Sequence, residues 1–348
     1  MKNRKLAVLL AGLLAVTTAI PALAGPASEL KDQGSGAASA GQTYQQSSAS
    51  GAQSSSQGQS STKAKKEEHR KTAEELQQVY ATVPAGPAKA EWGTFFLANN
   101  QPPRNDEDES FLRGYHAYAM VPTTEKYVYL TFDEGYENGF TPPILDVLKK
   151  HNVKACFFCT GSFIRDNPDL VKRFHDEGHI IGNHTLSHPS MMKVATWQEF
   201  SRQLLSVEDM VKGITGADMP RYYRPPSGGY SEAHLRMADA MGFKTIFWSV
   251  AYKDWDTSAQ PSQTYAMNYL TTRIHPGAII LLHAVSSTNA AIMDQLLTTW
   301  EQMGYSFRTL DELHRQGLGD RRLDNAAYPP LVHRLQGSCQ LLVPDGFT

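Results

Sequence analysis

The chain is poor in cysteine and has no excess of either charge. Three of its 348 residues are cysteine, and 33 Lys and Arg stand against 35 Asp and Glu. This balance excludes a protein that works by general attraction to nucleic acid or anionic lipid, because both need a dominant basic surface. The odd number of cysteines says little about the redox compartment.

Two of the cysteines, Cys156 and Cys159, have the C-x-x-C spacing of redox dithiols, but they lie in the strand-like run 155–160. Residues three apart along a strand are separated by about 10 Å and face opposite ways, which is beyond the reach of a disulfide. We therefore predict two buried thiols, with dithiol redox chemistry as the alternative.

Long apolar runs are also scarce, and the one candidate lies at the start of the chain. Three basic residues within 2–5 are followed by an apolar run at 6–20 and by Ala-Leu-Ala at 22–24. This order is typical of a secretory signal peptide, here residues 1–24. The run is short for a membrane span, which needs about 20 residues, although an uncleaved anchor is the alternative. We expect an exported, extracytoplasmic protein at the cell wall or the outer face of the membrane.

Core-forming residues are nearly absent from the next segment. Ser, Gln, Gly and Ala make up 30 of the 38 residues from 25 to 62. Such a composition cannot offset its ordering entropy, so residues 25–66 are predicted to be a flexible tether. Residues 67–124 are interpreted as an N-terminal extension, and the folding part is expected to start near Trp92.

From residue 127 onward, β-rich runs alternate with segments of helical pattern. The predicted strands cover 127–132, 155–160, 179–183, 222–224, 245–248, 278–282 and 305–308. Helix starts are indicated by Thr141 as a cap before Pro142 and by a capping box that opens at Thr196. Seven strand–helix pairs with short connections predict an α/β fold with a parallel sheet.

The positions of unusual polar residues decide between an open sheet and a barrel. They follow five different strands: Asp133 and Glu134, His184 and His188, Arg224, Asp254, and His283. An open sheet gathers such residues only where the strand order reverses. A ring of strands brings them together at its C-terminal face. We therefore predict an incomplete (β/α) barrel with seven or eight parallel strands.

Two of these groups have the chemistry of a metal site. His184 and His188 lie four apart in a loop or single turn, and two imidazoles with a carboxylate commonly hold Zn²⁺ or a similar ion. The adjacent acids Asp133 and Glu134 point different ways at a strand end, so one can bind a metal while the other accepts a proton from water. Each motif alone is equally compatible with a solvated polar loop.

The other groups suit substrate binding and proton transfer. Arg224 precedes a Pro-Pro-Ser-Gly-Gly turn and suits a carboxylate partner or a substrate anion. A lone histidine such as His283 is more often structural. With Asp254 to orient it, His283 becomes a candidate general acid.

In this order, the motifs resemble those of the polysaccharide deacetylases, carbohydrate esterase family four or the NodB-homology domain. The resemblance covers residues 125–313, the predicted catalytic domain, and leaves a C-terminal tail at 314–348. The stretches most similar to the delta-lactam-biosynthetic de-N-acetylases, which act on muramic residues of peptidoglycan in spore-cortex formation, are Phe132–Gly139, Trp248–Trp255 and His275–His283.

The resemblance implies a role for each residue. Asp133 would be the base and His283 the acid, with Arg224 holding Asp133 and Asp254 orienting His283. A divalent ion, for which zinc is the first candidate, would bind His184, His188 and Glu134. Trp255 and Leu282 would wall the acetyl pocket, and the Ser227 backbone N–H is a candidate oxyanion donor. Glu134 departs from the pattern, since most members carry Asp there and the lactam branch usually Asn, and its extra methylene would change the metal geometry.

The expected function is metal-dependent removal of N-acetyl groups from muramic acid residues, leading to muramic delta-lactam. One alternative is a deacetylase of GlcNAc in peptidoglycan or another polysaccharide, and another is a wall-binding protein without turnover. A pure binder needs neither an acid nor a base with orienting partners. The expected partners are peptidoglycan glycan strands, with no nucleic acid and no inferable protein partner, and a monomer is expected.

Overall fold

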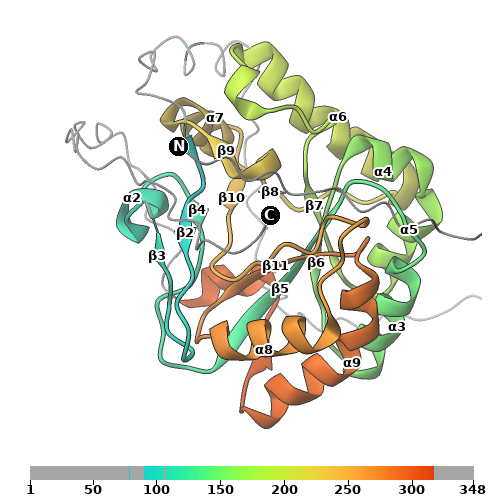
Figure 1. Ribbon diagram of the computed structural model, residues 1–348. Helices are drawn as coiled ribbons and strands as arrows, with labels where there is room; N and C mark the ends of the chain where they lie inside the picture. The colour runs from blue at the N-terminus through green and yellow to red at the C-terminus, as the bar shows by residue number, and fades with distance from the viewer. Residues whose placement is uncertain (1–77, 79–89, 106, 317–348) are drawn as a thin grey trace, which may run out of the picture. The chain divides into compact units, whose positions relative to one another are not determined.

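The computed structural model describes residues 78, 90–105 and 107–316 (Figure 1). The predicted signal peptide at 1–24, the tether at 25–66 and nearly all of the tail at 314–348 lie outside the described residues. Within the described part of the chain, no helix is both long and apolar enough to cross a membrane.

Eight parallel strands form the main sheet, in the order β11-β5-β6-β7-β8-β10-β4 with β12 paired to β5. They are β4 (Ala117–Tyr118), β5 (Tyr127–Glu134), β6 (Cys156–Cys159), β7 (Ile180–Asn183), β8 (Tyr222–Tyr223), β10 (Lys244–Ile246), β11 (Ile279–His283) and β12 (Ser306–Phe307). Beyond β10, Val250 forms a parallel bridge with Ile280, so the sheet curls back onto β11. The predicted incomplete barrel is confirmed, and β4 is the strand that the sequence pattern did not reveal.

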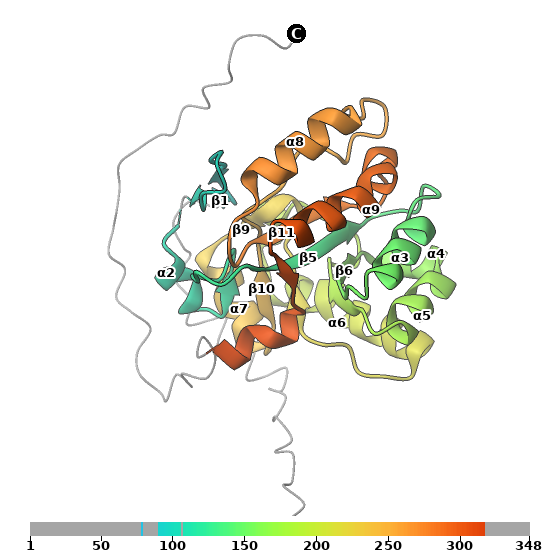
Figure 2. The same cartoon turned by 90° about the horizontal axis from the view of Figure 1, so that it is seen from below.

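Helices lie around the outside of this sheet (Figures 1 and 2). They are α2 (Glu109–Arg113), α3 (Thr141–Lys150), α4 (Gly161–Asp166), α5 (Pro168–Asp176), α6 (Trp197–Thr215), α7 (Glu232–Ala240), α8 (Gln263–Arg273) and α9 (Ser287–Gln302), with 3₁₀ turns η1 (Met191–Lys193), η2 (Pro226–Gly228) and η3 (Leu310–Gln316). Thr196 caps α6 as predicted, through a bond from the Glu199 backbone N–H to its hydroxyl. The prediction for Thr141 was wrong: Phe140 is the N-cap of α3, and the Thr141 hydroxyl is buried inside the first turn.

Strand side chains alternate between the barrel interior and an outer face covered by helices. The outer cluster joins strand residues such as Phe132 and Leu282 to α3, α5, α6, α8 and α9. The interior cluster contains residues of the opposite parity, among them Tyr129 and Ile279. Cys156 belongs to the interior and Cys159 to the outer cluster. Both are buried free thiols, which confirms the prediction against a disulfide.

The segment before residue 125 is part of the same folded unit. β1 (Ala90–Glu91) pairs antiparallel with β9 (Gly229–Tyr230), and β2 (Thr94–Phe95) pairs with β3 (Arg104–Asn105). Because β4 is a strand of the main sheet, the fold extends upstream of the boundary expected at 125.

Candidate active site

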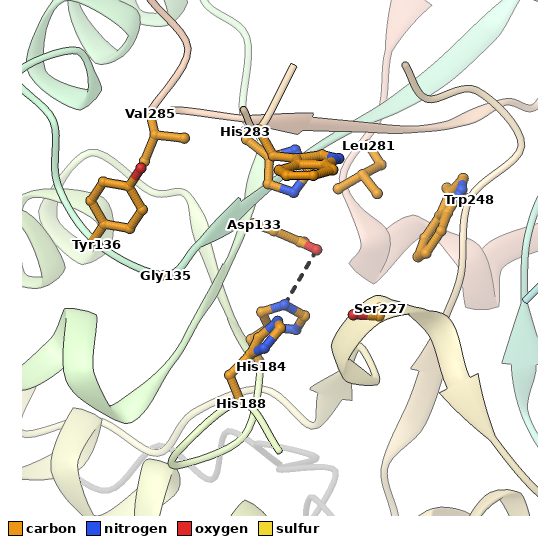
Figure 3. Close-up of a pocket in the computed structure, with 11 residues that line it drawn as sticks. Asp133, Gly135, Tyr136, His184, His188, Ser227, Trp248, Leu281, His283 and Val285 are labelled. Atoms are coloured by element: carbon orange, nitrogen blue, oxygen red, sulfur yellow. Dashed lines mark ion pairs between the residues drawn. The ribbon is translucent and has the colours of Figure 1, made fainter. Parts of the chain in front are cut away.

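A cavity of about 620 Å³ opens at the carboxyl ends of the barrel strands (Figure 3). Of the predicted site residues, those that line it are Asp133, His184, His188, Ser227, Trp255 and His283. Arg224 and Asp254 are fully buried and bind cavity residues through their side chains. The sequence therefore predicted most of the side chains that this end of the barrel brings together.

Asp133 stands on the interior face at the end of β5, where Arg224 binds it. Arg224 Nη1 donates to Asp133 Oδ1 over 2.8 Å. The guanidinium is held in turn by the carbonyl oxygens of Ile246 and Phe247, and it stacks 4.2 Å from the ring centre of Phe158. Burial by itself raises the pKa of Asp133, but the charge of Arg224 and then of the neighbouring histidines lowers it below the usual value. Asp133 is therefore an ionised carboxylate at neutral pH.

His283 is oriented by Asp254. Its Nδ1 lies 2.7 Å from Asp254 Oδ1, and its backbone N–H donates to Oδ2 over 2.8 Å. Asn289 Nδ2 donates to the same Oδ2 over 2.6 Å, so the carboxylate is fixed on both sides. Burial lowers the pKa of His283, but the charge and hydrogen bond of Asp254 outweigh it and raise the pKa above its usual value. Since Nδ1 is bound to Asp254, the proton that His283 can give to a substrate is the one on Nε2.

His184 and His188 lie on the loop that follows β7, with their ring centres 4.8 Å apart. His184 Nδ1 lies 2.8 Å from the carbonyl oxygen of Arg224, which can only accept, so Nδ1 carries the proton. Burial is the main reason why the pKa of His184 falls to about 4, and burial lowers that of His188 as well. Both imidazoles are therefore neutral at pH 7.

This arrangement fits a cation in the kind of donors that it offers. The unprotonated Nε2 of His184 faces the ionised Oδ2 of Asp133 at 3.4 Å, so two electron-rich atoms point at each other (dashed line in Figure 3). A backbone carbonyl that fixes the other ring nitrogen is the usual support of a metal-binding histidine. In residues 90–105 and 107–316, no three or more His, Cys, Asp or Glu side chains form a ready-made metal cluster. The candidate ligands are therefore His184 and His188, beside Asp133.

Comparison with known proteins agrees with this site. A sequence model described as polysaccharide deacetylase matches residues 120–246. The peptidoglycan-N-acetylmuramic acid deacetylase PdaA of Bacillus subtilis is 45% identical over 223 residues, which cover 64% of this chain and 84% of that protein. The chain belongs to the polysaccharide deacetylase family. It is therefore a hydrolase of N-acetyl amides, as predicted.

Two further comparisons place this deacetylase within the family. The solved structure of Bacillus subtilis PdaA, described as a family 4 carbohydrate esterase, matches with a TM-score of 0.63 and 43% identity, over 66% of this chain and 98% of that one. The peptidoglycan-N-acetylglucosamine deacetylase PgdA of Listeria monocytogenes is 40% identical over 195 residues, 56% of this chain and 40% of that protein.

Two predicted site residues of the deacetylase lie on the other face of their strands. Glu134 follows Asp133 and Leu282 precedes His283, so strand alternation turns both away from the cavity. Leu282 is buried in the outer cluster, and Leu281 lines the cavity in its place. Leu282 was predicted to wall the acetyl pocket, but it does not line the cavity, and Leu281 lines it instead.

Glu134 is fully buried and does not line the cavity with the two histidines. Both of its carboxylate oxygens lack a hydrogen-bond partner in the described structure. Burial raises its pKa well above the usual value, and the charges of Glu137 and Asp133 add to that effect. Its proposed role as a metal ligand is not supported by this placement.

Several residues around the cavity received no role from the sequence. Tyr136 and Trp248 line it from opposite sides in Figure 3, and Tyr136 is half exposed. The Tyr136 hydroxyl lies 3.5 Å from Thr257 Oγ1, on the loop that carries Trp255. Exposed aromatic rings with a polar tip suit a sugar substrate. The sequence offered two signals for a role of Tyr136 and Trp248 at the site. Both residues lie shortly after the end of a strand, and both belong to the motifs that carry the family resemblance.

Proposed function

We propose that this protein removes N-acetyl groups from muramic acid residues of peptidoglycan glycan strands, outside the cytoplasm and with a divalent metal ion. The observation that carries the proposal is the presence at one cavity of a carboxylate bound by a buried arginine and a histidine bound by a buried aspartate. Arg224 keeps Asp133 ionised, and Asp254 favours the protonated form of His283. Hydrolysis of an amide needs both, because water must lose a proton and the departing amine must gain one.

The residues divide the reaction as follows. Asp133 accepts a proton from the attacking water as the new C–O bond forms at the acetyl carbon. The negative charge that develops on the carbonyl oxygen requires a donor, and the backbone N–H of Ser227, which lines the cavity, is the candidate within the chain. His283 then gives its Nε2 proton to the sugar nitrogen as the C–N bond breaks, which releases acetate and a free amine.

Metal dependence is proposed from the two histidines. Deacetylases of this family are generally metal-dependent, and His184 and His188 are neutral and suitably supported. A divalent ion bound there would polarise the acetyl carbonyl and favour loss of a proton from water. Zinc is our first candidate, since imidazole nitrogen is among its preferred ligands.

The substrate assignment is supported by the similarity to PdaA, whose name specifies N-acetylmuramic acid. The similarity to PgdA keeps N-acetylglucosamine as the second candidate. The aromatic side chains of Tyr136, Trp248 and Trp255 around the cavity are suited to either sugar. We propose further that the muramic product closes to the delta-lactam of spore cortex.

One experiment separates these candidates. Peptide-stripped glycan strands are incubated with the protein, with and without chelator, and the muramidase digest is analysed by mass spectrometry. Acetyl loss on muramic acid supports the proposal, and subsequent loss of water supports the lactam. Acetyl loss confined to GlcNAc would show that N-acetylglucosamine, not N-acetylmuramic acid, is the substrate. If no mass changes, and Asp133→Asn behaves like wild type, the protein has no deacetylase activity on these strands, and the alternative of a wall-binding protein without turnover is supported.

A further inference from the structure

Trp92, which lies outside the matched residues 120–246, packs against the back of the active site. Its backbone N–H donates to the carbonyl oxygen of Gly228 over 2.8 Å. Its indole Nε1–H donates to the carbonyl oxygen of Trp248 over 3.0 Å. Trp92 thus binds two segments that each supply a cavity-lining side chain, Ser227 from the turn and Trp248 from the strand end.

The contact with the turn is close enough to determine its shape. Gly228 has φ +66°, and a Cβ at this position would lie 2.8 Å from the Cβ of Trp92 and 3.0 Å from the Trp248 ring. Ser227 itself has φ 52°, a left-handed conformation that a non-glycine residue keeps only where its surroundings hold it. Trp92 and Trp248 together close the space behind this turn.

A second connection runs from Trp92 to the catalytic base. The indole stacks on Phe247, with ring centres 4.6 Å apart and an interplanar angle of 21°. The carbonyl oxygen of Phe247 accepts from Arg224 Nη2, and Arg224 binds Asp133. Trp92 itself does not line the cavity. Any effect on the reaction must therefore pass through its neighbours.

We propose that Trp92 is a positioning residue of this deacetylase. It holds the Ser227 turn and the Trp248 wall in place through two hydrogen bonds, and it supports the Arg224 anchor by stacking on Phe247. The functional catalytic unit therefore includes β1 and Trp92 and begins upstream of residue 120. The kinetic part of this inference rests on the deacetylase activity proposed above.

Steady-state kinetics of the full chain test this role. Trp92→Phe keeps an aromatic ring on Phe247 but removes the indole donor, so KM for glycan strands should rise about fivefold with kcat nearly unchanged, as loss of one hydrogen bond allows. Trp92→Ala removes the stack as well, so kcat should fall about tenfold as the Arg224 anchor loosens. If Trp92→Ala does not fold, the Phe variant alone carries the test.

Trp300→Phe is the matched control. This indole is buried as well, but it lies on α9 in the outer cluster, and its Nε1 has no hydrogen-bond partner in the described structure. Its KM and kcat should equal those of wild type even if its melting temperature falls. Wild-type kinetics in Trp92→Phe, or equal kinetic losses in both Phe variants, would overturn the proposal.

Hydrogen exchange gives a readout that does not need turnover. Backbone amides of residues 247–250 should exchange faster in Trp92→Phe than in wild type or Trp300→Phe, because this segment loses the indole donor to the Trp248 carbonyl, whereas the Ser227 turn keeps its bond from the Trp92 backbone N–H. Unchanged exchange would overturn the positioning role even in an inactive protein. A wild-type protein that deacetylates no glycan would instead contradict the proposed function.

Discussion

Asp133 and His283 are register partners on the adjacent parallel strands β5 and β11. Both belong to the interior face of the barrel, so the proposed base and acid project into the same cavity. The groups that set their charges come from other parts of the fold, Arg224 after β8 and Asp254 from the loop beyond β10. Each proton-transfer residue thus has its own buried partner, which allows the two to hold opposite protonation states side by side.

Replacing the base should remove most of the activity. Asp133→Asn keeps the shape of the side chain but cannot accept a proton, so kcat should fall by at least about 100-fold, within the usual range for general-base catalysis. Acetate release from glycan strands measures it. Asp209→Asn, at an exposed position of α6, is the control and should retain wild-type kcat. A kcat for Asp133→Asn close to that of wild type would exclude Asp133 as the base.

The pH profile should be limited on its alkaline side by His283. The pKa of His184 is about 4 without a cation, and a bound cation competes with the proton, so this ligand stays neutral above pH 4, where Asp133, whose pKa is lowered below 3.8, is ionised. As the pH rises, His283 loses its proton above the ordinary value of 6.5. Initial rates at saturating substrate should therefore hold between about pH 4 and 6.5 and decline above pH 6.5. An alkaline decline below pH 6.5 would contradict the assignment of His283 as the acid.

Removing the charge of Asp254 should move the alkaline decline. Burial lowers the pKa of His283 and Asp254 raises it, so in Asp254→Asn the burial effect prevails and His283 loses its proton at lower pH. At pH 8 the variant should be at least about tenfold slower than wild type, which the same rate assay measures. Asp256→Asn, in the same loop, changes a carboxylate that binds Lys253 and Ser258. In Asp256→Asn the rate should decline at the same pH as in wild type.

Seven strands of the main sheet were predictable because the chain repeats one pattern. Most of the predicted strands are apolar runs closed by a polar residue, and each of the seven is present in the sheet. Polar residues at the ends of three of these strands line the cavity, so Asp133, His184 and His283 were identifiable together. The carboxyl ends of parallel strands lie at the same end of the barrel, so residues that follow different strands in the sequence come together in one site.

Two kinds of feature could not be predicted from the sequence. One is the face of a strand on which a given residue lies, and the other is contact between residues far apart in the chain. Leu281 and Leu282 are chemically equivalent, and only the register of β11 decides that Leu281 faces the cavity. The same alternation separates Glu134 from Asp133. The two-residue strand β4 is too short to show a period, and Trp92 acts across 156 positions through its bond to Trp248. No local pattern carries such information.

Divalent-ion binding should depend on the two loop histidines. His184→Ala and His188→Ala should each weaken Zn²⁺ binding by at least about tenfold in calorimetric titration. A chelator should abolish acetate release by wild type, and added Zn²⁺ should restore it. His175→Ala, exposed on α5, is the matched control. Zn²⁺ binding that is equal in all variants would place the metal elsewhere.

Glu134→Gln separates a role in the fold from a role at the metal. Burial, with the charges of Glu137 and Asp133, raises the pKa of Glu134 well above 4.5, so the folded protein keeps this carboxyl protonated to a higher pH than the unfolded chain does. The unfolded chain releases that proton above its ordinary pKa. This group therefore destabilises the fold progressively as the pH rises from 4.5 towards the raised pKa. Gln has no proton to lose, so the variant should be more stable than wild type at pH 8 and equal to it near pH 4.5.

Thermal unfolding with chelator present measures this difference, and each kcal/mol should appear as a shift of about 2–4 °C in Tm. Glu125→Gln, at an exposed position, controls for the loss of a carboxylate. Zn²⁺ titration of the same variants tests the other role. Unchanged Zn²⁺ affinity in Glu134→Gln, together with the stability gain at pH 8, would show that Glu134 affects the stability of the fold and does not bind the metal. A tenfold loss of affinity without that gain would instead make it a metal ligand, because a coordinating carboxylate must be ionised and must reach the cavity.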